Sequence, residues 1–249
     1  MTVSTARYAS LSGRAVLVTG GASGIGAHMV SEFAGQGARV TFLDIDAAAA
    51  SRLVAEVPQA RFIACDLTDI AALRAAVAEA GDVDVLVNNA ARDDRHALES
   101  VEPDHWRRFL AMNLDHQFFA TQAVLPQMKA RRTGAIIMMG SISWMRARGG
   151  MVGYTAAKAA INGMTRTLAR ELGEDGIRVN CIVPGAINTE RQAALWRTPE
   201  LDRQIIENQA LKIPLDGSHV ARMALFLASD EASGLTGQNF IVDAGMTLN

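Results

Sequence analysis

Seven short runs of apolar and β-branched residues recur along the chain, separated by longer alanine-rich stretches. Most of the runs lack polar alternation, which is typical of strands covered on both faces. The predicted strands are Ala15–Thr19, Arg39–Asp44, Arg61–Asp66, Val83–Asn88, Ala135–Gly140, Arg178–Val183 and Asn239–Asp243. Helical patterns between them include Asp69–Ala80, Pro103–Met128 (two helices) and Tyr154–Gly173.

Strands that alternate with helices imply right-handed crossovers and a parallel sheet. We therefore predict an α/β fold, with one doubly wound, Rossmann-type domain over residues 1–249. It would hold a seven-stranded parallel sheet with helices on both faces. Residues 186–215 interrupt the alternation and contain no predicted strand. A loop region this long is usually functional, and it follows the sixth strand, so we predict a substrate lid there.

A glycine-rich turn, Gly20–Gly26, follows the first predicted strand and precedes an amphipathic helix. Glycine lets a pyrophosphate approach the main chain, and the helix that follows offers unpaired N–H groups and a positive dipole end. A tight turn without a ligand is the alternative, but its position directly after the first strand favours a dinucleotide. The residues expected to contact the cofactor here are Gly20, Ser23, Gly24, Ile25 and Gly26.

Asp44 ends the second strand, 18 residues after Gly26, where a carboxylate would meet the adenosine ribose. It would repel the 2′-phosphate of NADP, and the turn contains no Lys or Arg to offset it, so the sequence favours NAD. Asp44 could instead cap the next helix, but Asp46 is equally placed for that. Further cofactor contacts are expected at the ends of the third and fourth strands, although these positions could be ordinary turns: Asp66, Leu67, Asn89 and Ala90.

Tyr154 and Lys158 lie four residues apart at the start of a helical stretch, on one helix face. An ammonium group nearby lowers the pKa of a phenol, so the pair could act as a proton acceptor. Such a pair also arises by chance on helix surfaces. Its context favours catalysis, because Ser141 ends the fifth strand and could orient a substrate oxygen. Asn113 lies in the preceding helical region and could hold a water near Lys158.

In order and spacing, these motifs resemble the short-chain dehydrogenase/reductase family, together with Asn88-Asn-Ala90 and Pro184-Gly185. The resemblance covers the chain from Leu11 to Leu248. It implies that Tyr154 is the acid/base, that Lys158 binds the nicotinamide ribose, that Ser141 positions the reacting oxygen and that Asn113 supports a proton-relay water. It also implies further nicotinamide contacts at Pro184, Gly185, Ile187 and Thr189. The chain departs from the family pattern at Ala91, where glycine is common.

A narrower set of motifs follows the fourth and fifth strands, lies in the predicted lid or closes the chain: Arg92–His96, Gly140–Trp144, Thr189–Gln192, Trp196, Thr198–Glu200 and Val242–Gly245. This set resembles the bacterial NAD-dependent aldose 1-dehydrogenases, a group that includes D-xylose dehydrogenases. These enzymes oxidise the anomeric hydroxyl of a cyclic sugar to a lactone. A pyranose needs several hydrogen-bonding groups and an apolar platform. The candidate substrate residues are Asp93, Arg95, His96, Ser141, Ser143, Trp144, Arg148, Tyr154, Asn188, Gln192 and Trp196. The charged loop over residues 92–96 could instead form its own salt bridges.

Arg146 and Arg148 point to a different substrate, since a neutral sugar needs no guanidinium whereas a carboxylate binds one through two hydrogen bonds. The alternative is a sugar-acid dehydrogenase, for instance one acting on the 4-hydroxyl of a 2-keto-3-deoxy acid. The two arginines could equally be solvated or bridge subunits. A non-catalytic NAD-binding scaffold is a third hypothesis, and the complete set of four catalytic residues argues against it.

The net charge of −2 gives no basic face for nucleic acid. Cys65 and Cys181 lie far apart in apolar segments, which is typical of buried thiols in a reducing compartment. No apolar run is long enough to cross a bilayer, and the N-terminus lacks a signal-peptide core. The five histidines show no metal-ligand spacing. We therefore expect a cytoplasmic protein without a metal, and the family resemblance implies a homotetramer.

Overall fold

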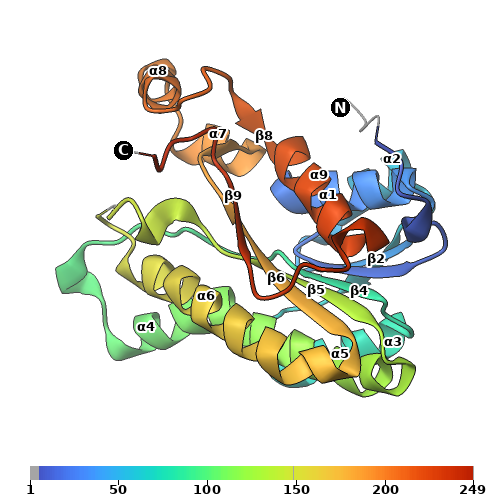
Figure 1. Cartoon of the computed structure of the whole chain (residues 1–249). Coiled ribbons are helices and arrows are strands. Elements are labelled where there is room, and N and C mark those ends of the chain that lie inside the picture. The colour runs from blue at the N-terminus through green and yellow to red at the C-terminus, as the bar shows by residue number, and fades with distance from the viewer. Residues whose placement is uncertain (1–5, 148, 249) are drawn as a thin grey trace.

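The computed structural model describes residues 6–147 and 149–248. Its main sheet has seven parallel strands in the order β3-β2-β1-β4-β5-β6-β9, which confirms the predicted doubly wound fold (Figure 1). The seven strands are β1 (Ala15–Thr19), β2 (Arg39–Asp44), β3 (Arg61–Ala64), β4 (Val85–Asn88), β5 (Gly134–Met139), β6 (Ile177–Pro184) and β9 (Asn239–Val242).

Helices cover both faces of the sheet, as predicted. One face carries α1 (Gly24–Gly35), α2 (Ala47–Glu56) and α9 (Gly217–Ala228), and the other carries α3 (Ile70–Ala80), α5 (His116–Arg131) and α6 (Val152–Leu172) (Figure 1). Each face has its own apolar core, because neighbouring strand residues point to opposite sides. Val16 and Val18 of β1 belong to the core beneath α1 and α9, whereas Leu17 lies in the core beneath α3, α5 and α6.

Residues 103–128 were predicted to form two helices, and the structure joins them through a π-helical turn. Helix α4 (Pro103–Leu110) leads into the turn Ala111–Asp115, and α5 follows without a break. Turns of this kind insert one extra residue and often mark functional sites. The predicted catalytic residue Asn113 lies at its centre and is fully buried.

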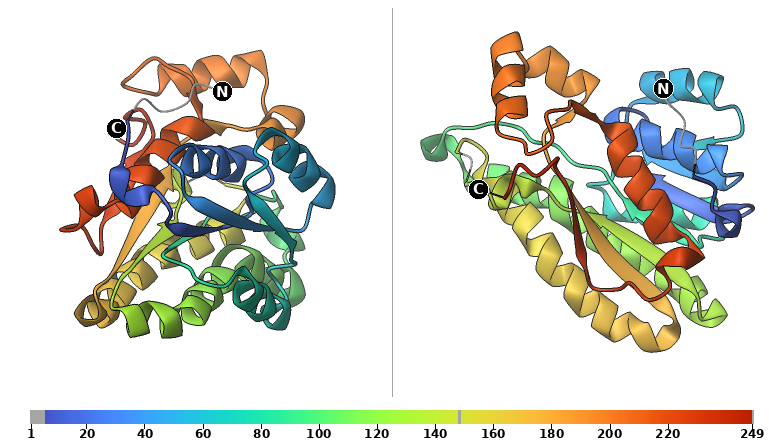
Figure 2. Two further views of the ribbon diagram at one scale, coloured as in Figure 1. Left: turned by 90° about the vertical axis from the view of Figure 1, so that its right-hand side faces the viewer. Right: turned by 45° about the horizontal axis from the view of Figure 1, so that its top comes forward.

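The predicted lid contains more regular structure than expected. Two short strands, β7 (Ile187–Asn188) and β8 (Leu215–Asp216), pair with each other outside the main sheet. The prediction of a strand-free segment was therefore wrong, because two-residue strands carry no readable alternation. Between them lie α7 (Glu190–Leu195) and α8 (Pro199–Glu207), which stand apart from the main sheet in Figure 2.

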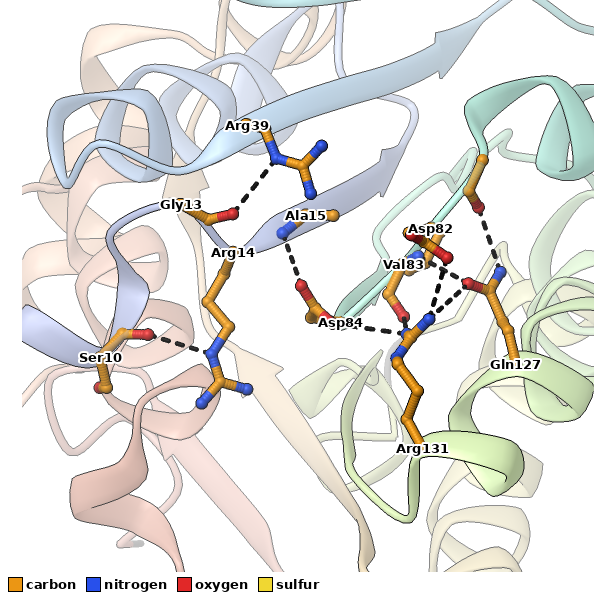
Figure 3. A network of polar contacts seen from close by, with 11 residues as sticks. Ser10, Gly13, Arg14, Ala15, Arg39, Asp82, Val83, Asp84, Gln127 and Arg131 are labelled. Atoms are coloured by element: carbon orange, nitrogen blue, oxygen red, sulfur yellow. Dashed lines mark hydrogen bonds and ion pairs between the residues drawn. The ribbon is translucent and has the colours of Figure 1, made fainter.

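At the amino ends of the strands, a polar network joins β1, β4 and α5 (Figure 3). The Asp84 carboxylate accepts a hydrogen bond from the Ala15 backbone at 2.9 Å. Arg131 of α5 lies 3.0 Å from Asp82 and 3.4 Å from Asp84. These contacts fix the edge opposite the glycine-rich turn. Among the described residues, no helix has the length and apolar character needed to span a membrane.

Candidate active site

The glycine-rich turn lies where the strand order reverses, between β1 and β4, which is the ligand-binding crevice of doubly wound sheets. A Cβ atom on Gly26 would lie 2.0 Å from the carbonyl oxygen of Gly20, so only glycine fits there. The Asn89 amide donates to the carbonyls of Thr19 and Gly20 at 3.0 and 2.9 Å. Asn89 therefore braces the turn, and Ala90 packs against it.

The first turn of α1 fits the phosphates of a dinucleotide. Ser23 is the N-cap residue, and within the described chain its side chain makes no capping hydrogen bond. Its hydroxyl and the N–H groups of the half-buried Ile25 and its neighbours are therefore available to an anion. Gly24 adopts a φ of 54°, and a Cβ added there would lie 3.3 Å from Thr189 of the lid. The predicted cofactor residue Thr189 thus faces the turn.

Asp44 lies beside this turn at the end of β2. One carboxylate oxygen accepts from the Ala22 N–H at 2.9 Å and the other from the Asp46 N–H at 3.0 Å. Asp46 caps α2 through the Ala49 N–H, as expected. Asp44 is therefore not free of partners, but a carboxylate can accept about four hydrogen bonds and retains capacity for ribose hydroxyls.

The other predicted cofactor residues lie along the carboxyl edge of the sheet. One carboxylate oxygen of Asp66 accepts two hydrogen bonds from Thr68, as expected for an ordinary turn at the end of the strand. Leu67, the next residue, is half-buried. Pro184 ends β6, and Ile187, only 2% exposed, opens β7.

Tyr154 and Lys158 project from the first turns of α6, with the Lys158 Nζ 5.6 Å from the centroid of the Tyr154 ring. Burial and, to a smaller extent, the charge of Asp93 raise the pKa of Tyr154 to about 12, although a hydrogen bond with Ser141 acts in the opposite direction. Burial also lowers the pKa of Lys158 to about 8. The expectation that Lys158 brings the Tyr154 pKa below its ordinary value is therefore not met, because desolvation of the phenolate dominates.

Lys158 is buried and donates from Nζ to the carbonyl of Met139, at the end of β5, at 2.7 Å. The side chain of Asn113 is held by two backbone groups: its amide donates to the Phe109 carbonyl at 3.0 Å and its carbonyl accepts from the Arg92 N–H at 2.9 Å. His116, one turn further, is fully buried. Burial and the charge of Lys158 lower the pKa of His116 to about 3, so this histidine is neutral.

A pocket opens from Tyr154 and Ser141 toward the lid. Seven of the predicted substrate residues line it, namely Asp93, Arg95, Ser141, Ser143, Tyr154, Gln192 and Trp196. Sequence reasoning left the other lining residues out of the predicted site: Ile142, Arg146, Met151, Gly185 (as a substrate contact), Ala186, Arg197, Leu201, Ile205 and Met246. Three of these residues, Ile142, Arg146 and Met151, lie between Ser141 and Tyr154 along the chain. Another four lie in the predicted lid, so the sequence indicated their region of the site without singling out their side chains: Ala186, Arg197, Leu201 and Ile205.

Polar contacts connect the lid to the loop after β4. Arg191 of α7 lies 3.6 Å from Asp93 and 2.7 Å from Asp94. The Arg95 guanidinium lies 5.0 Å from the centroid of the Trp196 ring, so one face of the predicted sugar platform carries a cation. The loop thus forms salt bridges and lines the pocket at the same time.

Three predicted substrate residues do not line this pocket. His96 stacks on Phe109 of α4 with a centroid separation of 4.6 Å. Trp144 and Asn188 are exposed. Arg148 lies outside the described residues.

Comparison with known proteins agrees with this geometry. Residues 20–247 match the family model described as enoyl-(acyl carrier protein) reductase. The chain is 50% identical to the D-xylose 1-dehydrogenase of Caulobacter vibrioides, covering 98% of this chain and 99% of that protein. It is 46% identical to the "Probable galactose dehydrogenase GalD" of Rhizobium meliloti, covering 99% and 100%. A solved short chain dehydrogenase/reductase family protein superimposes with a TM-score of 0.88 at 31% identity, covering 96% and 100%.

The sequence motifs, the strand order and these full-length similarities agree. The chain belongs to the short-chain dehydrogenase/reductase family and is an oxidoreductase that acts on CH–OH groups.

Proposed function

We propose that the protein uses NAD to oxidise the anomeric hydroxyl of an aldose, a pentose, hexose or 6-deoxyhexose, to the lactone. The observation that carries the proposal is the pocket, in which Tyr154 and Ser141 lie together with neutral and charged hydrogen-bonding side chains. Such a lining suits a polyhydroxylated ring. The two named relatives, a D-xylose 1-dehydrogenase and a probable galactose dehydrogenase, support the same substrate class.

In this mechanism the phenolic oxygen of Tyr154 accepts the proton of the sugar hydroxyl, while the Ser141 hydroxyl holds the same oxygen in place. Lys158 supplies positive charge near the phenolate, and Asn113 supports a water close to Lys158. The glycine-rich turn and Asp44 would hold NAD, which would supply the acceptor for the hydride of the sugar carbon.

NAD is proposed over NADP because Asp44 lies where the ribose hydroxyls would bind. Within the turn Gly20–Gly26 there is no cationic side chain, and the next residue after Asp44, Ile45, is an exposed apolar side chain. A 2′-phosphate would therefore meet a carboxylate and no counter-charge. We further propose a homotetrameric assembly in a reducing compartment such as the cytoplasm, without nucleic acid or a membrane as partner. Cys65 and Cys181 are buried free thiols, consistent with such a compartment.

A second candidate substrate is a sugar acid such as a 2-keto-3-deoxy acid, oxidised at its 4-hydroxyl. Arg146 lines the pocket, and it forms no salt bridge with any carboxylate of the described residues. Its guanidinium instead contacts the Met246 sulfur at 2.7 Å. A substrate carboxylate could replace that contact through two hydrogen bonds.

Steady-state rates of NADH formation with pentoses, hexoses, 6-deoxyhexoses and 2-keto-3-deoxy acids decide between the candidates. We expect turnover of aldoses, and loss of turnover with preserved NADH binding in Tyr154→Phe. Turnover of the acids alone would exclude the aldose proposal. Unchanged activity in Tyr154→Phe would exclude the proposed acid/base.

A further inference from the structure

Arg197 is a buried guanidinium in the wall of the substrate pocket. It lies in the link between α7 and α8, its side chain is only 9% exposed, and it lines the same pocket as Ser141 and Tyr154. A side chain of this kind is rarely buried without a partner that uses its charge and its donors.

The lid holds Arg197 in one orientation. Its Nε donates to the Asp202 carboxylate of α8 at 2.6 Å, and its backbone N–H donates to the Gln192 carbonyl at 3.0 Å. Thr198 caps α8 directly after it by accepting from the Leu201 N–H at 3.1 Å. Helix α8 therefore fixes the guanidinium of Arg197, because the helix carries Asp202 and begins directly after Arg197.

One end of this guanidinium has no partner within the described chain. The Nη1 atom is buried and makes no hydrogen bond to any described residue, and the same holds for the Ser143 hydroxyl in the same pocket. Leaving a buried donor unpaired is costly, so paired groups are the rule in protein interiors. A ligand that hydrogen-bonds these two groups would supply the missing partners.

We propose that Arg197, oriented by Asp202, binds a non-reacting ring hydroxyl of the sugar and selects a hydroxyl over a carboxylate at that position of the pocket. This inference rests on the proposed aldose oxidation. Asp202 already balances the charge of Arg197, so Nη1 is a strong donor without a net charge to neutralise. A hydroxyl satisfies such a group, whereas a carboxylate would be repelled by Asp202 nearby. Arg197 is thus the substrate-binding residue, and Asp202 is its positioning residue.

The first test combines protein and substrate changes. Arg197→Met and the control Arg203→Met are assayed with D-xylose and its 2-, 3- and 4-deoxy analogues. Arg203 pairs with Glu200 on the exposed side of the same helix, so it controls for general effects on α8. In the wild type and the control, removal of the bound hydroxyl should lower kcat/KM on the order of 10- to 100-fold. In Arg197→Met that penalty should disappear for one analogue only.

The second test uses D-xylose and D-glucuronate, which share ring hydroxyl configuration and differ by the carboxylate on C5. Asp202→Asn keeps an acceptor for Nε but removes the charge. We expect the ratio of kcat/KM for glucuronate over xylose to rise on the order of tenfold, with no rise in Glu200→Gln. A merely structural role of Asp202 would lower both values together. Melting temperature and NADH binding report whether the variants are folded.

The outcomes separate this inference from the proposed function. If the wild type oxidises no aldose, the proposed function fails. If it oxidises aldoses but Arg197→Met retains every deoxy-sugar penalty, the role of Arg197 is wrong while the function stands. An unchanged substrate ratio in a folded Asp202→Asn would contradict the charge-balance argument.

Discussion

The proposed role of Lys158 and its surroundings have opposite effects on its charge. The role requires a charged ammonium group that favours the phenolate of Tyr154, whereas burial lowers the pKa of Lys158 to about 8 and so disfavours that charge. The folded protein therefore carries an ammonium group in a site that disfavours it, with the Met139 carbonyl as its hydrogen-bond partner. Burial of a charged group lowers the stability of the folded protein, and this is common at sites where catalytic groups are held in place.

This cost predicts a pH dependence of stability. The folded pKa of Lys158, about 8, lies below its ordinary value of 10.5. Between these values the unfolded chain binds a proton that the folded chain does not, so the wild type gains stability as pH rises. Relative to Lys158→Met, its free energy of unfolding should increase by about 1 kcal/mol from pH 7 to pH 9.

Urea denaturation of both proteins at the two pH values measures this. In Lys158→Met the Met139 carbonyl is left unpaired. This shifts the difference in free energy of unfolding between the two proteins by the same amount at every pH, so it does not affect how that difference changes with pH. A difference that stays level or falls with pH would show that Lys158 keeps its ordinary pKa in the folded state.

Asp44 carries the cofactor preference. Asp44→Asn removes the charge that would repel a 2′-phosphate but keeps the acceptor for the Ala22 N–H. We expect the ratio of kcat/KM for NAD over NADP to fall on the order of tenfold or more, since two like charges about 4 Å apart repel each other by about 1 to 4 kcal/mol. Initial rates with each cofactor measure the ratio. The control is Asp46→Asn, which removes a neighbouring carboxylate charge but keeps an oxygen that can cap α2 through the Ala49 N–H. An unchanged ratio of kcat/KM for NAD over NADP in Asp44→Asn would show that another residue sets the cofactor preference.

At this scale, the sequence allowed the catalytic residues to be predicted because their order and spacing along the chain are distinctive. The pocket wall was harder to predict. Arg197 lies far along the chain from Tyr154, and only the path of α7 and α8 brings it into the same pocket. His96 follows a strand as a pocket residue should, but its ring stacks on Phe109 of α4 and does not line the pocket. Neither outcome has a local sequence signal.

The helices and strands also differ in how well they could be predicted from the sequence. Strand β1 is buried along its whole length and begins and ends where its apolar run does, since burial on both faces leaves a continuous signal. The lid strands β7 and β8 are two residues long and gain stability only by pairing with each other, so no periodicity predicted them. The π-helical turn around Asn113 likewise has no sequence pattern of its own.

The lid is connected to the body by Arg191, which bridges Asp93 and Asp94. Arg191→Gln should weaken closure over the sugar and raise its KM about 3- to 10-fold, because a partly buried ion pair contributes on the order of 1 kcal/mol. NADH binding should change little. Initial rates as a function of sugar concentration measure the effect, with Arg107→Gln, from the exposed pair with Asp104, as the control. An unchanged KM would mean that this contact does not govern the lid.

On the scale of the whole molecule, one edge of the sheet lacks a covering strand in the described chain. Strand β9 is the last in the order, and Ile241 on it is exposed, as are the nearby side chains of Leu211 and Leu248. Figure 1 shows this strand beside the C-terminal end of the chain. An apolar edge of this kind favours association with a second copy.

The proposed homotetramer predicts a solution mass of four times the 26.6-kDa chain. Ile241→Asp should reduce the mass to a smaller assembly, because a carboxylate would be buried at the edge where copies meet. Light scattering after size exclusion measures both proteins, and circular dichroism checks that the variant is folded. A wild type with the mass of one chain would contradict the tetramer.

We propose that Tyr154 accepts the proton of the anomeric hydroxyl of an aldose, while the hydride leaves the anomeric carbon for NAD. Oxidation of D-xylose or D-galactose that carries deuterium only on C1, followed by mass spectrometry of the cofactor, tests it most directly. The mechanism predicts one deuterium in every NADH that the wild type forms. It predicts no NADH formation by Tyr154→Phe. Unlabelled NADH from the wild type would place the oxidised hydroxyl on another carbon and contradict the account.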